Sequence, residues 1–400
     1  MLNNLPSGIR GVLKRSRFQT GLQAPLLSVL FFFFFTLLFF DWFVSVPWRA
    51  GRVDSYILFS TAETSRFYYA KIAPYNPLVL LNPNAKPGYV MISSVFLLLF
   101  PFGIFSLRLL SSLLSLGTLV VSYKLARKAG LSDFASSIAV IFILTSPLFF
   151  LASIAALSET LFCFSLVLAM YLLYAKRYLL LTLLTSCLPV IRQEGAIYLV
   201  IVFFFLLKEK RLRHAFFLPV PLFVWAFLNS SILGHSLFYP FFVSLDLPGP
   251  TSKSEVMPIS GLGSLIRPIL YNPAFLLFPF GAIISIFKRR CIPITVSLAV
   301  HILFFLSAAA LQLIFIKQIS YNLRYLVPII PFLAIVSAVI FEKNNPENRI
   351  RAVTVLLTAL ALTAALIIQI RLLQKNPRVA ARAFNQQQER EIREACIWLD

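Results

Sequence analysis

The chain has 400 residues, of which 59% are hydrophobic and 13% are charged, whereas soluble domains carry about 25% charged residues. This composition excludes a soluble globular domain and predicts a chain covered largely by lipid. The net charge of +21 comes from short basic clusters between apolar stretches. Such clusters are typical of the cytoplasmic loops of membrane proteins and argue against nucleic-acid binding.

The first apolar stretch, 26–46, is too long for a signal-peptide core and predicts a transmembrane helix. Residues 1–25 before it are basic and are predicted to be cytoplasmic. Alternation of the basic clusters then predicts an all-α membrane protein with about eleven transmembrane helices within residues 26–371. The predicted spans are 26–46, 105–123, 134–152, 157–175, 178–193, 194–207, 214–233, 268–287, 291–315, 325–341 and 352–371.

Two outer loops and an outer tail follow from this topology. The first loop, 48–104, ends in an apolar segment, 89–104, which we expect to be a juxtamembrane or re-entrant helix because a span there would invert every later cluster. The second loop is 234–267. The tail, 372–400, stops within an amphipathic pattern, so either a helix ends there or a longer outer domain continues; we favour the second.

Ionisable groups near the membrane are costly and functional by default. Setting aside loop, cap and tail acids leaves a short list of candidate acids on or near the outer face. These are Asp41, Asp54, Glu63, Glu159, Glu194, Asp246 and Glu255. Asp54 is either a general base at the mouth of a cavity or a helix cap. Glu159 is either a functional acid or a helix-start acid favoured by the helix dipole.

Basic groups on the outer face are fewer and therefore informative. Arg192 and Glu194 are predicted to pair with each other or with a bound group. Lys86, Arg324 and the adjacent Tyr325 suit a phosphate or pyrophosphate headgroup, or they anchor the chain at the interface. The sequence has no HExxH, Walker, GxSxG or CxxC motif.

Several short motifs, in this order, resemble the GT-C superfamily of polytopic glycosyltransferases. They include a first-loop Asp54, the Lys-Pro-Gly-Tyr element 86–89, Ser-Glu-Thr-Leu-Phe at 158–162, Arg-Gln-Glu-Gly at 192–195, and Arg324-Tyr325 with two later prolines. The elements are similar to those of dolichyl- or polyprenyl-phosphate-mannose-dependent mannosyltransferases, including protein O-mannosyltransferase and aminoarabinose transferase relatives. The likeness covers about residues 26–341.

The resemblance implies an enzyme that moves a sugar, most simply a mannose-like hexose, from a polyprenyl- or dolichyl-phosphate carrier to a lipid, glycan or protein acceptor. It implies Asp54 as the base, with Glu63 as the fallback and Glu159 as a second acid. It also implies Lys86, Arg192, Glu194, Arg324 and Tyr325 as substrate-binding residues. We expect no cofactor and no obligatory metal, because the Asp-x-Asp pattern of metal-holding relatives is absent.

The departures from the family pattern are Ser55 after Asp54 and Gly88 in place of a second proline. We expect an inner-membrane protein with a cytoplasmic N-terminus and an active site on the extracytoplasmic face. Two alternatives remain: a transporter or flippase of a lipid-linked or anionic substrate, and a lipid-linked glycan polymerase or ligase. Transporters often show internal repeats, and none is evident here.

Overall fold

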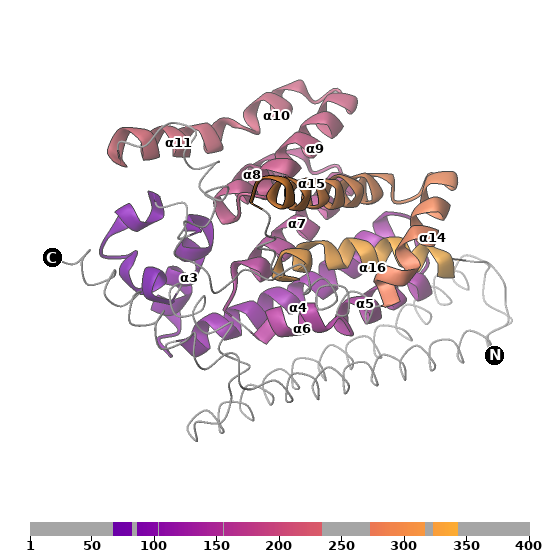
Figure 1. Ribbon diagram of the computed structural model, residues 1–400, viewed down its shortest axis with the longest axis horizontal. Helices are drawn as coiled ribbons and strands as arrows, with labels where there is room; N and C mark the ends of the chain where they lie inside the picture. Colours follow the sequence, from indigo (N-terminus) through magenta and orange to yellow (C-terminus); the bar gives the residue numbers. More distant parts are fainter. Residues whose placement is uncertain are drawn as a thin grey trace, which may run out of the picture. The chain divides into compact units, whose positions relative to one another are not determined.

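The computed structural model describes residues 67–81, 86–102, 104–154, 156–233, 273–316 and 323–342. Within these ranges the regular structure is entirely helical, which confirms the predicted all-α class (Figure 1). The first described residues, 67–72, are helical and are followed by the short 3-10 helix η2 (Pro77–Leu81).

The remaining helices follow one another with short connections. They are α3 (Pro87–Leu99), α4 (Ile104–Lys128), α5 (Asp133–Leu144), α6 (Pro147–Ile154), α7 (Ser158–Tyr174), α8 (Tyr178–Ile191), α9 (Gly195–Lys208), α10 (Leu212–Phe217), α11 (Val220–Leu233), α14 (Pro273–Phe287), α15 (Ile292–Ile316), η5 (Leu323–Ile329), α16 (Ile330–Ala338) and η6 (Val339–Phe341).

Each predicted span between 105 and 341 overlaps described helical structure, and residues 268–272 of the span 268–287 lie outside the described residues. Two of these spans are interrupted at proline, which lacks the backbone N–H of a helix interior. α5 and α6 are separated before Pro147, and α10 and α11 are separated around Pro219.

Two described helical stretches, Phe105–Lys128 and Leu212–Ile232, are long and apolar enough to cross a membrane by length and composition. The predicted spans 26–46 and 352–371 lie outside the described residues. The count of eleven therefore stays a prediction.

The end of the first outer loop forms a helix of its own. α3 stops at Leu99, and α4 starts at Ile104 after a non-helical break that contains Pro101. The sequence predicts this separate helix at 89–104, and the structure places it at Pro87–Leu99. Its position relative to the membrane stays a prediction.

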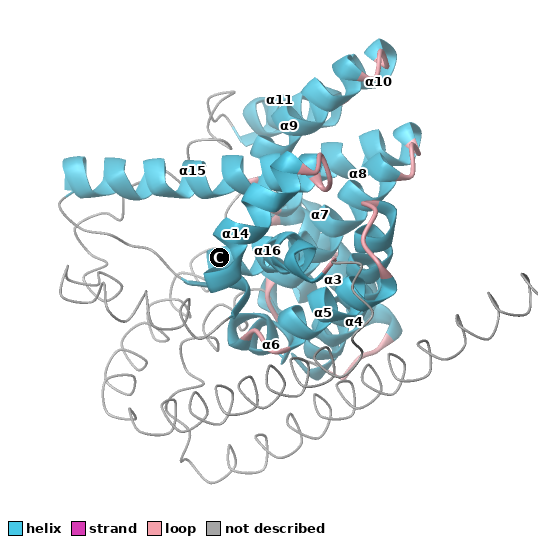
Figure 2. Ribbon diagram, turned by 90° about the vertical axis from the view of Figure 1, so that its right-hand side faces the viewer, coloured by secondary structure: helices cyan, strands magenta, loops and turns pink. Residues whose placement is uncertain are grey.

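α4 and α7 form the centre of the described bundle. α7 packs between α4 and α8, while α16 packs against α5 and α14 (Figures 1 and 2). Small polar side chains join these helices: the Thr160 hydroxyl of α7 lies 3.3 Å from the Ser111 hydroxyl of α4, and the Ser112 hydroxyl donates to the Ser153 carbonyl of α6 at 3.0 Å. Hydroxyls can thus be buried because each finds an acceptor in a neighbouring helix.

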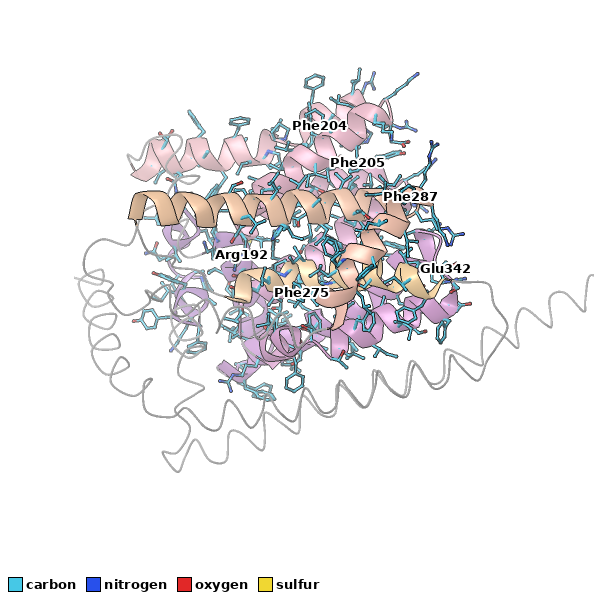
Figure 3. All side chains as sticks on the ribbon, turned by 45° about the vertical axis from the view of Figure 1, so that its right-hand side comes forward. Arg192, Phe204, Phe205, Phe275, Phe287 and Glu342 are labelled. Atoms are coloured by element: carbon cyan, nitrogen blue, oxygen red, sulfur yellow. The ribbon has the colours of Figure 1, made fainter. Side chains whose placement is uncertain are left out.

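The turns that carry the basic clusters meet at one end of the bundle. Glu342 pairs with Arg290 at 2.9 Å and accepts a hydrogen bond from the Ser132 backbone at 2.7 Å. α7 runs from this end to the opposite one, a distance of about 25 Å at 1.5 Å per residue. Figure 3 shows Glu342 and Arg192 toward opposite ends of the bundle. The structure therefore separates the described basic turns from Lys86, Glu159, Arg192 and Glu194, and which end faces the cytoplasm stays a prediction.

Candidate functional site

The candidate site is built around the turn between α8 and α9. α8 carries Pro189 in its last turn and ends at Ile191, because Arg192 has extended backbone. The turn closes with the Gly195 backbone N–H donating to the Arg192 carbonyl at 2.8 Å. A Cβ on residue 195 would lie 2.6 Å from the Pro189 nitrogen and closer still to the Leu188 carbonyl. Glycine is therefore required for α9 to begin this close to α8.

Arg192 is buried and holds two carboxylates from different elements. Its Nη1 lies 2.6 Å from Glu159 Oε1 at the start of α7. Its Nη2 and Nε donate to Glu194 Oε1 and Oε2 at 2.8 and 3.2 Å, so this pair is bidentate. The Arg192 side chain is 3% exposed, and that of Glu159 is 0% exposed. We call Arg192, Glu159 and Glu194 the Arg192 triad.

Ser158 completes the buried side of the triad. Its hydroxyl accepts from Arg192 Nη1 at 3.3 Å and donates to Glu159 Oε2 at 3.3 Å. Burying charges is costly unless they are paired and hydrogen-bonded. The triad satisfies this condition through one bidentate pair, one close pair and one bridging hydroxyl.

Lys86 reaches the same turn from the first outer loop. It precedes α3 in a left-handed conformation, φ 57°, and its Nζ donates to Gln193 Oε1 at 3.2 Å. The first turn of α3 lies close to the end of α8, since a Cβ on residue 88 would approach the Ile191 backbone nitrogen to 3.1 Å. Gly88, the departure from the Lys-Pro-Pro pattern, therefore stands at a close contact between α3 and α8.

The cluster is electrically balanced. Lys86 and Arg192 supply two positive charges, and Glu159 and Glu194 supply two negative ones. Burial by itself raises the pKa of the Glu194 carboxyl, but Arg192, and more weakly Lys86, outweigh it and hold that pKa below its usual range. Glu194 is therefore ionised near neutral pH, and the charges of these four described residues balance.

The structure brings four of the predicted site residues together: Lys86, Glu159, Arg192 and Glu194. They come from the first loop, the start of α7 and the α8–α9 turn, which are far apart in sequence. The geometry favours the ion-pair interpretation of Arg192 and Glu194. It also buries Glu159 against Arg192 at the start of α7, and the assignment of Glu159 as a second functional acid stays a prediction.

Seven other candidate residues have no described side-chain position. Asp41, Asp54, Glu63, Asp246 and Glu255 lie outside the described residues. Arg324 and Tyr325 lie in η5, whose backbone is described but whose first side chains are not. η5 packs against α7, the helix that begins with Glu159.

Two features were not anticipated by the sequence analysis. Gln193, the partner of Lys86, is neutral, so the criterion of an ionisable group near the membrane does not select it. His301 of α15 is fully buried, with its Nδ1 2.7 Å from the hydroxyl of Tyr198 on α9. A histidine within a predicted span is the signal that could have found this pair, one helical turn beyond Glu194.

Among the described residues no group of three or more His, Cys, Asp or Glu side chains is arranged to hold a metal ion. The first-loop acids are not among those residues. The expectation of a metal-independent site therefore stays a prediction.

Comparison with known proteins gives a partial match. Residues 79–184 match the family model described as dolichyl-phosphate-mannose-protein mannosyltransferase. This segment contains Lys86 and Glu159. No curated protein matches the chain.

Among solved structures, a similar one is the crystal structure of ArnT from Cupriavidus metallidurans in the apo state, at 17% sequence identity and a TM-score of 0.43. The match covers 65% of this chain, and the chain spans half the length of that protein. The family-model match confirms the predicted resemblance to the GT-C superfamily over residues 79–184.

Proposed function

We propose that the protein is a membrane glycosyltransferase that moves a mannose-like hexose from a polyprenyl- or dolichyl-phosphate carrier to an acceptor on the extracytoplasmic face. One observation carries the proposal: Lys86 of the first loop is held against the Arg192 triad, at the end of the bundle opposite the basic turns. The match of residues 79–184 to lipid-phosphate-mannose-dependent enzymes supports the donor class.

The chemistry needs few groups. The acceptor hydroxyl oxygen attacks the anomeric carbon, the bond from that carbon to the phosphate oxygen breaks, and the carrier leaves as a polyprenyl phosphate. Asp54 takes the hydroxyl proton in this proposal, with Glu63 as the fallback base. Lys86 and Arg324 bind the donor phosphate and stabilise the charge that develops on it.

The triad has a different part in the proposal. Both carboxylates of the triad engage the Arg192 guanidinium, which leaves this group less suited than Lys86 to receive a phosphate. Arg192, Glu159 and Glu194 therefore position the turn that bears Gln193, and Gln193 in turn orients Lys86. Tyr325, beside Arg324, is proposed to line the same substrate region.

The test is a transfer assay with purified protein in liposomes and radiolabelled polyprenyl-phosphate mannose. Asp54→Asn should reduce transfer by about a thousandfold, a barrier increase of ~4 kcal/mol, because the base is lost. Glu63→Gln should leave at least half of the activity. Equal transfer by Asp54→Asn and wild type would exclude Asp54 as the base.

The same preparation separates the other candidate functions. Movement of the lipid-linked sugar across the liposome membrane, with no transfer to any acceptor, would identify a transporter or flippase. Formation of sugar polymers still attached to the carrier would identify a polymerase. The proposed transferase releases polyprenyl phosphate in equal amount to the glycosylated acceptor.

A further inference from the structure

Several helices end at the end of the bundle that carries the basic turns, and they close with the same type of turn. In four of them the second residue after the helix has a left-handed backbone: Gly130 with φ 92°, Lys176 with φ 56°, Lys210 with φ 57° and Arg289 with φ 51°. The next backbone N–H donates to the carbonyl five residues back, as in the Schellman motif, with Arg177 reaching Leu172 at 3.0 Å and Arg211 reaching Leu206 at 2.8 Å.

Glycine is the usual residue at this left-handed position, because any side chain costs backbone strain there. Gly130 shows that the chain uses glycine at one of the four turns. The other three turns carry a lysine or an arginine instead. Each of these three cations bears a backbone strain that glycine would not, which indicates that the charge has a use at this end of the molecule.

Two of these turns are joined to each other. The Tyr178 hydroxyl, after the first turn, donates to Glu209 Oε2 of the second at 3.1 Å. The Arg211 guanidinium lies 4.9 Å from the centre of the Tyr178 ring, and His214 of α10 lies against the same ring with 6.3 Å between centroids. The α7–α8 and α9–α10 turns are therefore held side by side (Figure 2).

This pairing gathers exposed positive charge on one surface. We call it the twin-turn surface, and its cations are Lys176, Arg177, Lys208, Lys210, Arg211 and Arg213. Within residues 175–178 and 208–214 the only acid is Glu209, and it accepts from Tyr178. The surface is therefore strongly positive.

Apolar side chains border these cations. Leu179 and Leu180 in the first turn of α8 are 64% and 54% exposed, and Phe216 and Phe217 of α10 are 67% and 50% exposed. Cations beside exposed apolar groups match the boundary between lipid headgroups and acyl chains, where lysine and arginine extend toward the headgroups. A small water-soluble anion would leave these apolar groups uncovered.

We propose that the twin-turn surface is a binding site for the phosphate group of an anionic phospholipid. The pair of strained lysines, Lys176 and Lys210, supplies the principal cations, and Leu179 and Phe216 contact the acyl chains. This site is distinct from the Arg192 cluster, at the opposite end of α7. It is also independent of the proposed transferase reaction, since it needs no donor or acceptor sugar.

The experiment compares thermal unfolding of the purified chain in neutral detergent with added phosphatidylglycerol or phosphatidylcholine. Wild type should unfold at a higher temperature with phosphatidylglycerol than with phosphatidylcholine. The double variant Lys176→Gly/Lys210→Gly should unfold no earlier than wild type without lipid, because glycine relieves the strain. Its shift with phosphatidylglycerol should fall to half or less of the wild-type shift.

Two further variants keep the test decisive. Lys124→Gln/Lys128→Gln removes the same charge at the end of α4 and should keep the full lipid shift. Arg177→Gln/Arg213→Gln removes twin-turn charge at residues without left-handed backbone and should reduce the shift. Three results would overturn the proposal. They are a full shift of the unfolding temperature in both twin-turn variants, an equal loss of the shift in the α4 control, and the same shift of wild type with inorganic phosphate alone.

Discussion

Arg192 shows how one buried residue can join the elements of a candidate site. Its guanidinium joins the start of α7 to the α8–α9 turn through two carboxylates. A buried ion pair of this kind adds little net stability when it forms, but removing one partner is costly because it leaves buried charge uncompensated. The triad is therefore expected to be far more sensitive to single substitutions than an exposed pair.

Arg192→Met should destabilise the protein by about 3–5 kcal/mol at neutral pH, because Glu159 loses its partner while remaining buried and the half-buried Glu194 loses its bidentate partner. Thermal unfolding in detergent measures this loss. Arg127→Met is the matched control, since Arg127 and Asp133 form a 2.9 Å pair whose side chains are 41% and 51% exposed. The control should cost no more than about 1 kcal/mol.

The difference in the free energy of unfolding between wild type and Arg192→Met should depend on pH. The Glu194 pKa is lowered in the folded wild type. Ionised Glu194 therefore stabilises the folded state at pH values above its pKa in the unfolded chain, and this stabilisation is lost as pH falls through its pKa in the folded protein. Without Arg192, burial is left to raise that pKa. The stability gap should therefore narrow as pH falls through the acid range, and a gap that stays constant or widens would contradict this account of the triad.

Lys86 is predicted to act on the donor. Lys86→Met should lower kcat/KM for the lipid-linked sugar by about a hundredfold, or ~2.7 kcal/mol, through loss of one charged contact to the phosphate. Lys86→Arg should recover part of the activity. Lys128→Met, at the opposite end of the bundle, should match wild type, and equal losses in the two methionine variants would argue against a specific role for Lys86.

At the scale of elements, the α8–α9 hairpin sets the position of the whole site. Its turn carries Arg192, Gln193 and Glu194, and its closure depends on Gly195 lying against the Leu188–Pro189 backbone. α3 then packs on the same helix end through Gly88. A backbone shift at this turn would move both cations of the cluster together.

Gly195→Ala should reduce transfer at least tenfold and lower the thermal midpoint, because the added methyl group meets backbone, which cannot rotate away. Gly117→Ala is the control. A Cβ at 117 meets only the ring of Phe164, at 2.8 Å, and a ring can adjust. Similar effects of the two substitutions would show that the α8–α9 turn is not the sensitive element.

The helices themselves follow from the sequence, while their interruptions and contacts do not. Apolar stretches between basic clusters predict the span that corresponds to α4 and the span that corresponds to α7. The breaks before Pro147 and around Pro219 were missed because span prediction averages hydrophobicity over about twenty residues. Only the packing of α3, α7 and α8 brings together Lys86, Glu159, Arg192 and Glu194, and no sequence spacing specifies that packing.

At the scale of the whole molecule, the described bundle has two chemically different ends. One end collects the basic turns around Glu342 and Glu209, and the other collects the Arg192 triad and Lys86. The separation agrees with the predicted topology, in which ordinary basic charges are cytoplasmic. A donor embedded in the membrane would then meet Lys86 from the outer leaflet.

Cysteine labelling tests that orientation. In a background without native cysteines, Lys71→Cys in the first outer loop should react with a membrane-impermeant reagent added to intact cells. Lys128→Cys at the end of α4 should react only after the cells are opened. Both positions are exposed, so the reverse pattern would place the Arg192 cluster on the cytoplasmic side.

The most direct test of the central claim is release of polyprenyl phosphate from radiolabelled polyprenyl-phosphate mannose by the purified protein in liposomes. The account predicts that wild type releases the carrier in step with labelling of an acceptor fraction, and that Lys86→Met releases about a hundredfold less under the same conditions. Wild-type protein that binds the lipid but releases no carrier with any acceptor fraction supplied would contradict the account.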